Sequence, residues 1–204
     1  AVKSVLVDLN DAAATLPNSY NSVENITPLE TPLSSTINGA ALATPVFLSL
    51  YAENDLRLDK YFAETDEKGF RKNKKAGSNN YLCTFRVGEI YLTAAEAAAR
   101  LGELSQARTR LLELMRKRYA PEAYEAKSVV VNAMDKEALV QEILDERARE
   151  LAFEGHRWFD LRRSTRPRLE KVLDGTRYVL EENDARYTLA IPKEAIEANP
   201  GLLN

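Results

Sequence analysis

Residues 145–163 read DERARELAFEGHRWFDLRR, and this stretch does more than any other to decide the fold. It places Glu146, Glu150 and Glu154 one helical turn apart, so the three carboxylates share one face of a helix. Arg147 and Arg149 stand between them. Planar guanidinium groups bind carboxylates through paired hydrogen bonds, which suits partly buried networks. The stretch therefore predicts a helix whose charged side chains hold the structure together.

Three long helices are predicted around this stretch. Apolar stripes predict one helix over residues 86–101, ended by Gly102, and a second over residues 104–118. The loop between them is so short that the two helices must be antiparallel neighbours. Small residues on their facing sides are typical of a tetratricopeptide helix pair, although one repeat is too few for a free-standing solenoid. The third helix is expected to begin at Asp135 as N-cap and to run to Gly155.

The rest of the chain is predicted to be short elements and irregular segments. We expect a helix over residues 2–15, irregular chain over 17–45, partial helix over 46–63 with Asn54 or Asp55 as N-cap, and loop over 64–80. Near the C-terminus we expect a short helix at 157–163, strands at 178–180 and 187–191, and a helical turn at 192–196. The fold class is therefore mostly α, with tetratricopeptide-like helix pairs, long loops and a short β-hairpin near the C-terminus. The expected division is between residues 1–84 and 85–204.

The composition fits a globular protein and argues against several functions. Of 204 residues, 45% are hydrophobic and 29% charged, and the net charge is -3. This balance lacks the basic excess of a nucleic-acid binder. The basic run at residues 71–75 lies among Asn, Gly and Ser and is interpreted as a solvated loop. Cys83 is the one cysteine, which excludes an internal disulfide or a multi-thiolate zinc site, and it is expected to be a small buried hydrophobe.

Two catalytic alternatives to the structural interpretation involve His156. Glu150 and His156 invite comparison with a hydrolase, but six residues separate them and there is no second histidine to complete a metal pair. Cys83 and His156 form a conceivable nucleophile and base, with no motif around either. Phosphate-binding and nucleophile-elbow motifs are missing from the sequence. We therefore expect no catalytic residues, no metal site and no cofactor.

Several motifs, in order along the chain, resemble the SusD/RagB family. They are Arg86-Val87-Gly88-Glu89-Ile90-Tyr91-Leu92 with Ala95-Glu96-Ala97, Glu146-Arg147, Glu150-Leu151-Ala152-Phe153-Glu154-Gly155, Arg157-Trp158, Asp160-Leu161-Arg162, Leu189-Ala190-Ile191-Pro192, and Asn199-Pro200. The resemblance covers residues 85–204 well and residues 1–84 thinly. Ala190 stands where the family has proline.

The resemblance implies a lipid-anchored protein on the surface of the outer membrane. It implies capture of glycans or other nutrients together with a SusC-like TonB-dependent transporter, and no catalysis. Family members are more than twice as long, and the lipidated N-terminal cysteine is not in this sequence. The motif residues are expected to be structural. These residues are Arg86, Glu96, Glu146, Arg147, Glu150, Glu154, Arg157, Trp158, Asp160 and Arg162.

The ligand residues are predicted separately, because sugar recognition needs aromatic faces beside polar side chains. Residues 38–83 offer both, and we predict Tyr51, Phe70 and Tyr81 as ligand-binding residues. The alternative function is a tetratricopeptide-like scaffold that binds a protein partner and no small ligand.

Overall fold

The computed structural model describes residues 5–19, 22–30, 42–75, 81–173, 175–199 and 201. The chain divides into two compact units, Ala1–His156 and Arg157–Asn204, and each is described by itself. The expected division between residues 84 and 85 falls within strand β5 of the first unit.

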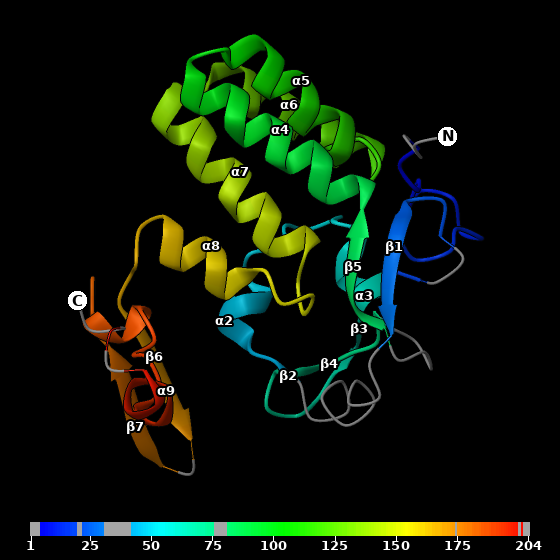
Figure 1. Cartoon of the computed structure of the whole chain (residues 1–204). Coiled ribbons are helices and arrows are strands. Elements are labelled where there is room, and N and C mark those ends of the chain that lie inside the picture. The colour runs from blue at the N-terminus through cyan, green and yellow to red at the C-terminus, as the bar shows by residue number, and fades with distance from the viewer. Residues whose placement is uncertain are drawn as a thin grey trace. The chain divides into compact units, whose positions relative to one another are not determined.

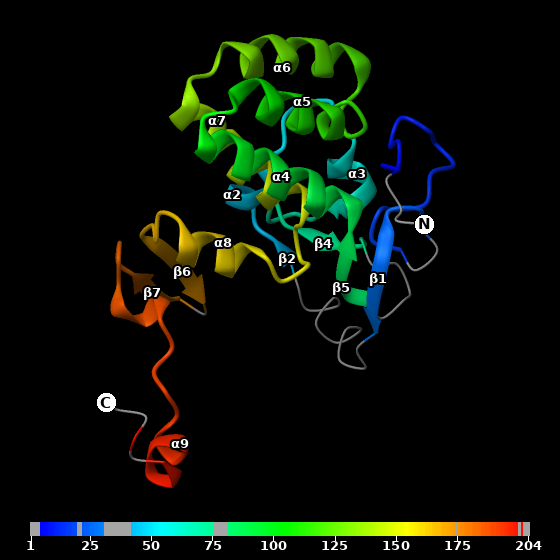
Figure 2. The same cartoon turned by 45° about the horizontal axis from the view of Figure 1, so that its top comes forward.

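Four successive helices form the main body of the first unit (Figure 1). They are α4 (Val87–Leu101), α5 (Leu104–Met115), α6 (Pro121–Ala133) and α7 (Lys136–Glu150). Helix α4 contacts both α5 and α7, and Figure 2 shows α6 as the outermost helix, with α5 between it and α4. The predicted antiparallel pair and the predicted third helix are confirmed, whereas α6 was not predicted.

Local signals in the sequence explain where these helices begin and end. Gly102 follows α4 with φ 86°, a left-handed conformation that glycine adopts without steric cost. The Asp135 carboxylate accepts a hydrogen bond from the Ala138 amide at 2.8 Å and caps α7 as predicted. Pro121 occupies the first turn of α6, where its missing N–H costs nothing.

An apolar core lies between the four helices. Its fully buried members include Leu92, Leu111, Leu114, Leu139 and Ile143, one or more from each of α4, α5 and α7. Their spacing of three or four residues along each helix is the stripe that the sequence predicts.

Short strands and two short helices complete the first unit. Strand β1 (Asn25–Glu30) pairs antiparallel with β5 (Tyr81–Arg86), which leads directly into α4, and a second sheet has the order β2-β4-β3. The strands of this second sheet are β2 (Leu42–Ala43), β3 (Phe62–Thr65) and β4 (Arg71–Asn73). The two short helices are α2 (Pro45–Leu48) and α3 (Arg57–Tyr61). The helices confirm the partial helix over residues 46–63. The predicted loop over residues 64–80 is corrected, because β4 lies within it.

The predicted N-terminal helix is wrong over the residues that the structure describes. Residues 5–16 contain turns and no helix. The Leu9 amide donates to the carbonyl of Lys117 at 2.9 Å instead of to its own segment. Val7 and Leu9 are buried and Val5 is exposed, so apolar residues of this irregular segment are buried without forming a helix.

The second unit contains α8 (Arg157–Arg163), β6 (Leu169–Leu173), β7 (Thr176–Leu180), a 3-10 turn at Ala185–Tyr187 and α9 (Lys193–Ala198). The predicted helices at 157–163 and near residue 196 are confirmed. A hairpin is present as predicted, but its strands are corrected: β7 pairs with β6, and Tyr187 belongs to the 3-10 turn. The ring of Trp158 stacks on that of Tyr187, with centroids 5.1 Å apart.

Candidate functional site

Ten buried charged side chains meet around the C-terminal half of α7, and we call them the ion cluster. The acids are Glu24, Asp55, Glu146, Glu150 and Glu154, and the bases are Arg57, Lys75, Arg86, Arg118 and Arg149. Every member bonds to another member of opposite charge. Acids and bases are equal in number, so the cluster carries no formal net charge.

Glu150 is the centre of the ion cluster. Its carboxylate accepts from Arg86 Nη1 at 2.6 Å, from Arg57 Nη1 at 3.1 Å, and from Arg118 Nε at 3.0 Å. Burial raises the pKa of Glu150, but the guanidinium groups of Arg118, Arg86 and Arg57 outweigh it and hold the pKa well below its usual value. Glu150 is therefore held as a carboxylate within the ion cluster.

Glu24 ties the chain before β1 to the same centre. It accepts from Arg86 Nη1 at 3.1 Å, from Arg118 Nη2, and from the Val7 backbone amide at 2.8 Å. The Glu24 carbonyl also accepts from the Val87 amide at 3.0 Å, at the first residue of α4. Glu24 therefore connects the N-terminal segment, α4 and the connection after α5.

Arg57 joins α3 to α7. It binds Asp55 through two bonds, Nε to Oδ1 at 2.9 Å and Nη2 to Oδ2 at 2.8 Å, and it donates from Nη1 to Glu146 at 2.7 Å. Its guanidinium carbon lies 5.1 Å from the centroid of the Tyr119 ring. Arg149 completes this side with a 2.8 Å bond to Glu146. Burial raises the pKa of Glu146, but Arg57 and Arg149 outweigh this effect and lower the pKa to about 2.

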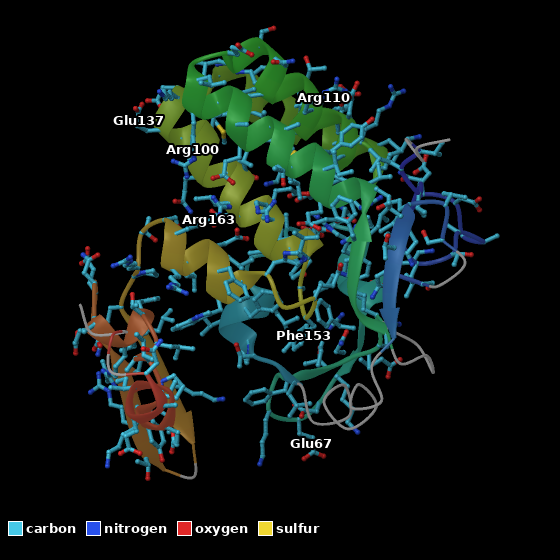
Figure 3. The ribbon with its side chains drawn as sticks, viewed as in Figure 1. Glu67, Arg100, Arg110, Glu137, Phe153 and Arg163 are labelled. Atoms are coloured by element: carbon cyan, nitrogen blue, oxygen red, sulfur yellow. The ribbon has the colours of Figure 1, made fainter. Side chains whose placement is uncertain are left out.

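Glu154 lies in the turn after α7 and binds both Arg86 and Lys75. Arg86 donates from Nε at 3.0 Å and from Nη2 at 2.9 Å, and Lys75 donates from Nζ. Phe153, just before it, has φ 61°, unusual for a residue with a side chain. Its ring meets Phe47 of α2 at 6.1 Å, and Figure 3 labels it in this turn. The turn thereby directs Glu154 back into the cluster.

Lys75 is the member that departs furthest from the sequence interpretation. The basic run was expected to be a solvated loop, but Lys75 is 1% exposed and its Nζ lies 4.4 Å from the centroid of the Tyr61 ring. Burial lowers the pKa of Lys75 to about 8, despite the nearby Glu154. Arg71 belongs to β4 and binds Asp59 at 2.9 Å. The solvated-loop interpretation is wrong for both residues.

Some of the predicted motif residues lie in the ion cluster, and the others lie elsewhere in the two units. Arg86, Glu146, Glu150 and Glu154 lie in the ion cluster. Glu96 is buried and accepts from Arg100 at 2.9 Å, and Arg147 is buried and donates to Thr93 at 3.2 Å. In the second unit, Asp160 accepts from Arg163 at 2.6 Å, Trp158 stacks on Tyr187, Arg157 is exposed, and the Arg162 carbonyl accepts from Arg166 at 3.0 Å.

Five members of the cluster were not predicted: Glu24, Asp55, Arg57, Lys75 and Arg118. Four of them bond to partners far along the chain; 94 residues separate Arg118 from Glu24 and 79 separate Lys75 from Glu154, whereas Asp55 binds Arg57, two residues away. The spacing of helical charges identified the α7 members. No comparable local pattern marks the other five.

Of the three predicted ligand residues, Tyr51 lies among core aromatics and next to Arg57 and Arg149 of the ion cluster. Tyr51 is 6% exposed, donates from its hydroxyl to the Arg149 carbonyl at 2.7 Å, and packs edge-to-face on Phe62 at 5.6 Å. Phe70 is half-buried after the turn at Gly69. The side chain of Tyr81, like that of Cys83, lies outside the described part. A ligand role for the three stays a prediction, and the burial of Tyr51 gives it little surface to offer.

The structure describes the surroundings of His156 and Glu150, the two residues first compared with a hydrolase site. His156 Nδ1 lies 3.8 Å from Glu89, and Glu150 is enclosed by arginines. Within those residues no three His, Cys, Asp or Glu side chains are grouped to hold a metal ion. No helix in the same part is both long and apolar enough to cross a membrane.

Comparisons with known proteins agree on one family. The family model of the SusD family matches residues 40–204. The chain is similar in structure to a SusD-like carbohydrate binding protein from Bacteroides vulgatus, with a TM-score of 0.65 and 17% identity over 97% of this chain and 52% of that one. No curated protein matches the chain.

Two further solved structures are similar. A SusD superfamily protein from Bacteroides thetaiotaomicron gives a TM-score of 0.70 and 21% identity, over 97% of this chain and 51% of that one. One from Bacteroides fragilis gives 0.56 and 24%, over 76% of this chain and 34% of that one. The chain thus spans about half the length of the first two.

Proposed function

The chain belongs to the SusD family, and from this premise we propose that it is part of a cell-surface protein that captures glycans or other nutrients. It hands them to a SusC-like TonB-dependent transporter in the outer membrane, where a lipid anchor retains it. It performs no chemistry on the nutrient.

The observation that carries this proposal is the family match over residues 40–204. The contacts of the motif residues in the ion cluster support it. The acids Glu146, Glu150 and Glu154 accept hydrogen bonds from buried arginines, and their pKa values are lowered. These bonds support a structural role for the three acids. One similar structure is described as a carbohydrate binding protein, which supports glycans as the nutrient class.

Binding to glycan arrays, followed by calorimetry on each hit, tests this function. We expect saturable binding of one polysaccharide class, and the bound glycan should be recovered unchanged by mass spectrometry. Release of shorter products by the wild type would contradict the non-catalytic assignment. The ligand residues are tested in the same assay. Phe70→Ala and Tyr81→Ala should weaken binding without lowering the melting temperature, and Tyr51→Ala should lower both.

One observation favours the second candidate, a scaffold that binds a protein partner. Val129 and Val130 of α6 are 71% and 57% exposed, and side chains of this kind often mark contact surfaces. On this alternative the wild type should bind no glycan, and the double change to Val129→Glu and Val130→Glu should reduce co-purification with its protein partner. Unchanged co-purification would remove this surface from consideration.

A further inference from the structure

A hollow of about 330 Å³ lies between the N-terminal segment and the connection from α5 to α6. Its lining residues are Asp8, Asn10, Arg116, Lys117, Tyr124 and Glu125, with Pro121 at one side. None of them belongs to the family motif or to the predicted ligand residues. The volume falls at the lower end of the range for small-molecule sites.

The walls of this hollow are held by buried contacts. The Leu9 amide donates to the Lys117 carbonyl at 2.9 Å, and Leu9 itself is 1% exposed. Arg118, the neighbour of Lys117, donates to the Val7 carbonyl and also belongs to the ion cluster. The two walls are more than one hundred residues apart in sequence, yet they are fixed to each other and to the core. The hollow is therefore formed before any ligand arrives.

Three polar side chains are set in place within it. Lys117 Nζ lies 2.8 Å from Asp8 Oδ2, and Asp8 Oδ1 accepts from the Asn10 amide at 3.1 Å and from its Nδ2 at 3.0 Å. Burial raises the pKa of Asp8, but the bonds from Lys117 and Asn10 outweigh it and lower the pKa below its usual value. Asp8 is thus an acceptor at neutral pH, and the ammonium of Lys117 has two further donors to offer.

Tyr124 and Pro121 supply the apolar part of the lining. Tyr124 is half-buried and packs against the apolar core of the helices, so its ring is fixed on one side. An aromatic ring beside paired donors and acceptors is the combination that a sugar needs, since its C–H face packs on the ring and its hydroxyls take the polar groups. Two acids and two bases line the hollow, and this balance favours a neutral ligand over a charged one.

We propose that this hollow is a subsite for one neutral sugar unit, in which Asp8 and Lys117 bind adjacent hydroxyls and Tyr124 packs against the ring. Adjacent hydroxyl oxygens on a sugar are about a hydrogen-bond length apart, which matches the 2.8 Å between the two charged atoms. The inference rests on the proposed capture of glycans and names a place for it.

A second hollow in the same unit provides a matched control. It has a similar volume of about 350 Å³ and is lined by Arg100, Lys136, Glu137 and Val140, with no aromatic side chain. Figure 3 labels Arg100 and Glu137 there. Lys136→Met therefore removes an equivalent charge from a hollow that lacks the features of a sugar site.

The test is NMR titration of the ¹⁵N-labelled chain with neutral gluco-, galacto-, manno- and xylo-oligosaccharides, and with oligogalacturonate as a charged counterpart. We expect one neutral oligosaccharide to shift the amides of Asn10, Lys117 and Tyr124. Lys117→Met should weaken that binding about tenfold or more, since a hydrogen bond from a charged group is lost. Lys136→Met should leave it unchanged, and Tyr124→Ala, checked for folding by its melting temperature, should weaken it as Lys117→Met does.

The other outcomes show whether the subsite alone fails or glycan capture fails with it. Binding whose shifts lie elsewhere, with the same affinity in Lys117→Met, overturns the subsite and leaves glycan capture standing. Equal binding of oligogalacturonate overturns the assignment to a neutral sugar. No shift with any member of the panel overturns the subsite and counts against glycan capture itself.

Discussion

The first half of α7 buries Leu139 and Ile143 among the other helices, whereas its second half buries Glu146, Arg149 and Glu150 beside the guanidinium groups of Arg57, Arg86 and Arg118. Apolar packing is non-directional, so it tolerates a change of shape when the volume is kept. A buried carboxylate is satisfied only by charge and geometry together, so a single missing partner leaves others uncompensated. One helix therefore contains a tolerant half and an intolerant half.

Glu150→Gln is expected to have the largest effect and tests the intolerant half directly. The substitution keeps the shape of the side chain but removes the charge that offsets Arg57, Arg86 and Arg118. We expect the free energy of unfolding to fall by about 3–5 kcal/mol, as measured by urea denaturation. Asp145→Asn, on the adjacent and less buried position, is the control and should change it little. A loss for Glu150→Gln no larger than that of the control would break the comparison.

Acidification should destabilise the second half of α7. The pKa of Glu146 is lowered from 4.5 to about 2, and the pKa values of Glu150 and Glu154 are also lowered. A carboxyl group with a depressed folded-state pKa contributes its full stability above its ordinary pKa and loses it as the pH falls. Glu146 alone should account for about 3 kcal/mol, lost between about pH 4.5 and pH 2. The urea midpoint measured against pH checks this, and Glu146→Gln should flatten the curve.

Gly88→Ala tests how closely the ion cluster packs against the first turn of α4. A methyl group there would lie 2.6 Å from Arg86 Nη1 and 3.1 Å from Glu150 Oε1. Alanine favours a helix by about 1 kcal/mol over glycine, yet we expect a net loss of about 1–3 kcal/mol because the ion pairs must move. Thermal unfolding gives the sign, and a stabilised variant would show that the cluster yields easily.

Leu139→Met tests the tolerant half and should have the smallest effect. Leu139 is fully buried in the apolar core, and methionine has a similar volume and a flexible side chain. We expect a loss below about 1.5 kcal/mol by urea denaturation. If this loss equalled that of Glu150→Gln, the two halves of α7 would not differ in the way described.

The long helices could be predicted from the sequence because their signals are local. The stripes of α4 and α5, the cap at Asp135 and the turn at Gly102 each lie within a few residues of the element they define. Helix α6 was missed because Val129 and Val130 are exposed and Val131 is buried, which hides the stripe. The hairpin was predicted between residues 178–180 and 187–191, although the Asp174-Gly175 pair is a strong hairpin signal of its own.

Features that depend on distant partners could not be predicted. Val7 and Leu9 fit a helical stripe as well as an extended one, and the bond from Leu9 to the Lys117 carbonyl decides between them. Lys75 sits in a polar basic run whose composition indicates solvent, and its burial follows from Glu154. Glu146, Arg149, Glu150 and Glu154 were identifiable because their charges lie at helical spacing, and Arg86 because it belongs to a motif that resembles the family's. The other half is brought in by the fold.

The reach of the ion cluster along the chain has a consequence for folding kinetics. Its bonds close loops of 68 residues between Arg86 and Glu154, and of 93 residues between Arg57 and Glu150. Contacts between distant residues form slowly, because the entropy of loop closure is lost before they are made. The helix pairs are expected to form early, from local contacts, and the cluster last. A ribosome-bound chain that ends before Glu150 would contain Arg57, Arg86 and Arg118 without their shared acid. The first unit should therefore become protease-resistant only after α7 has been synthesised.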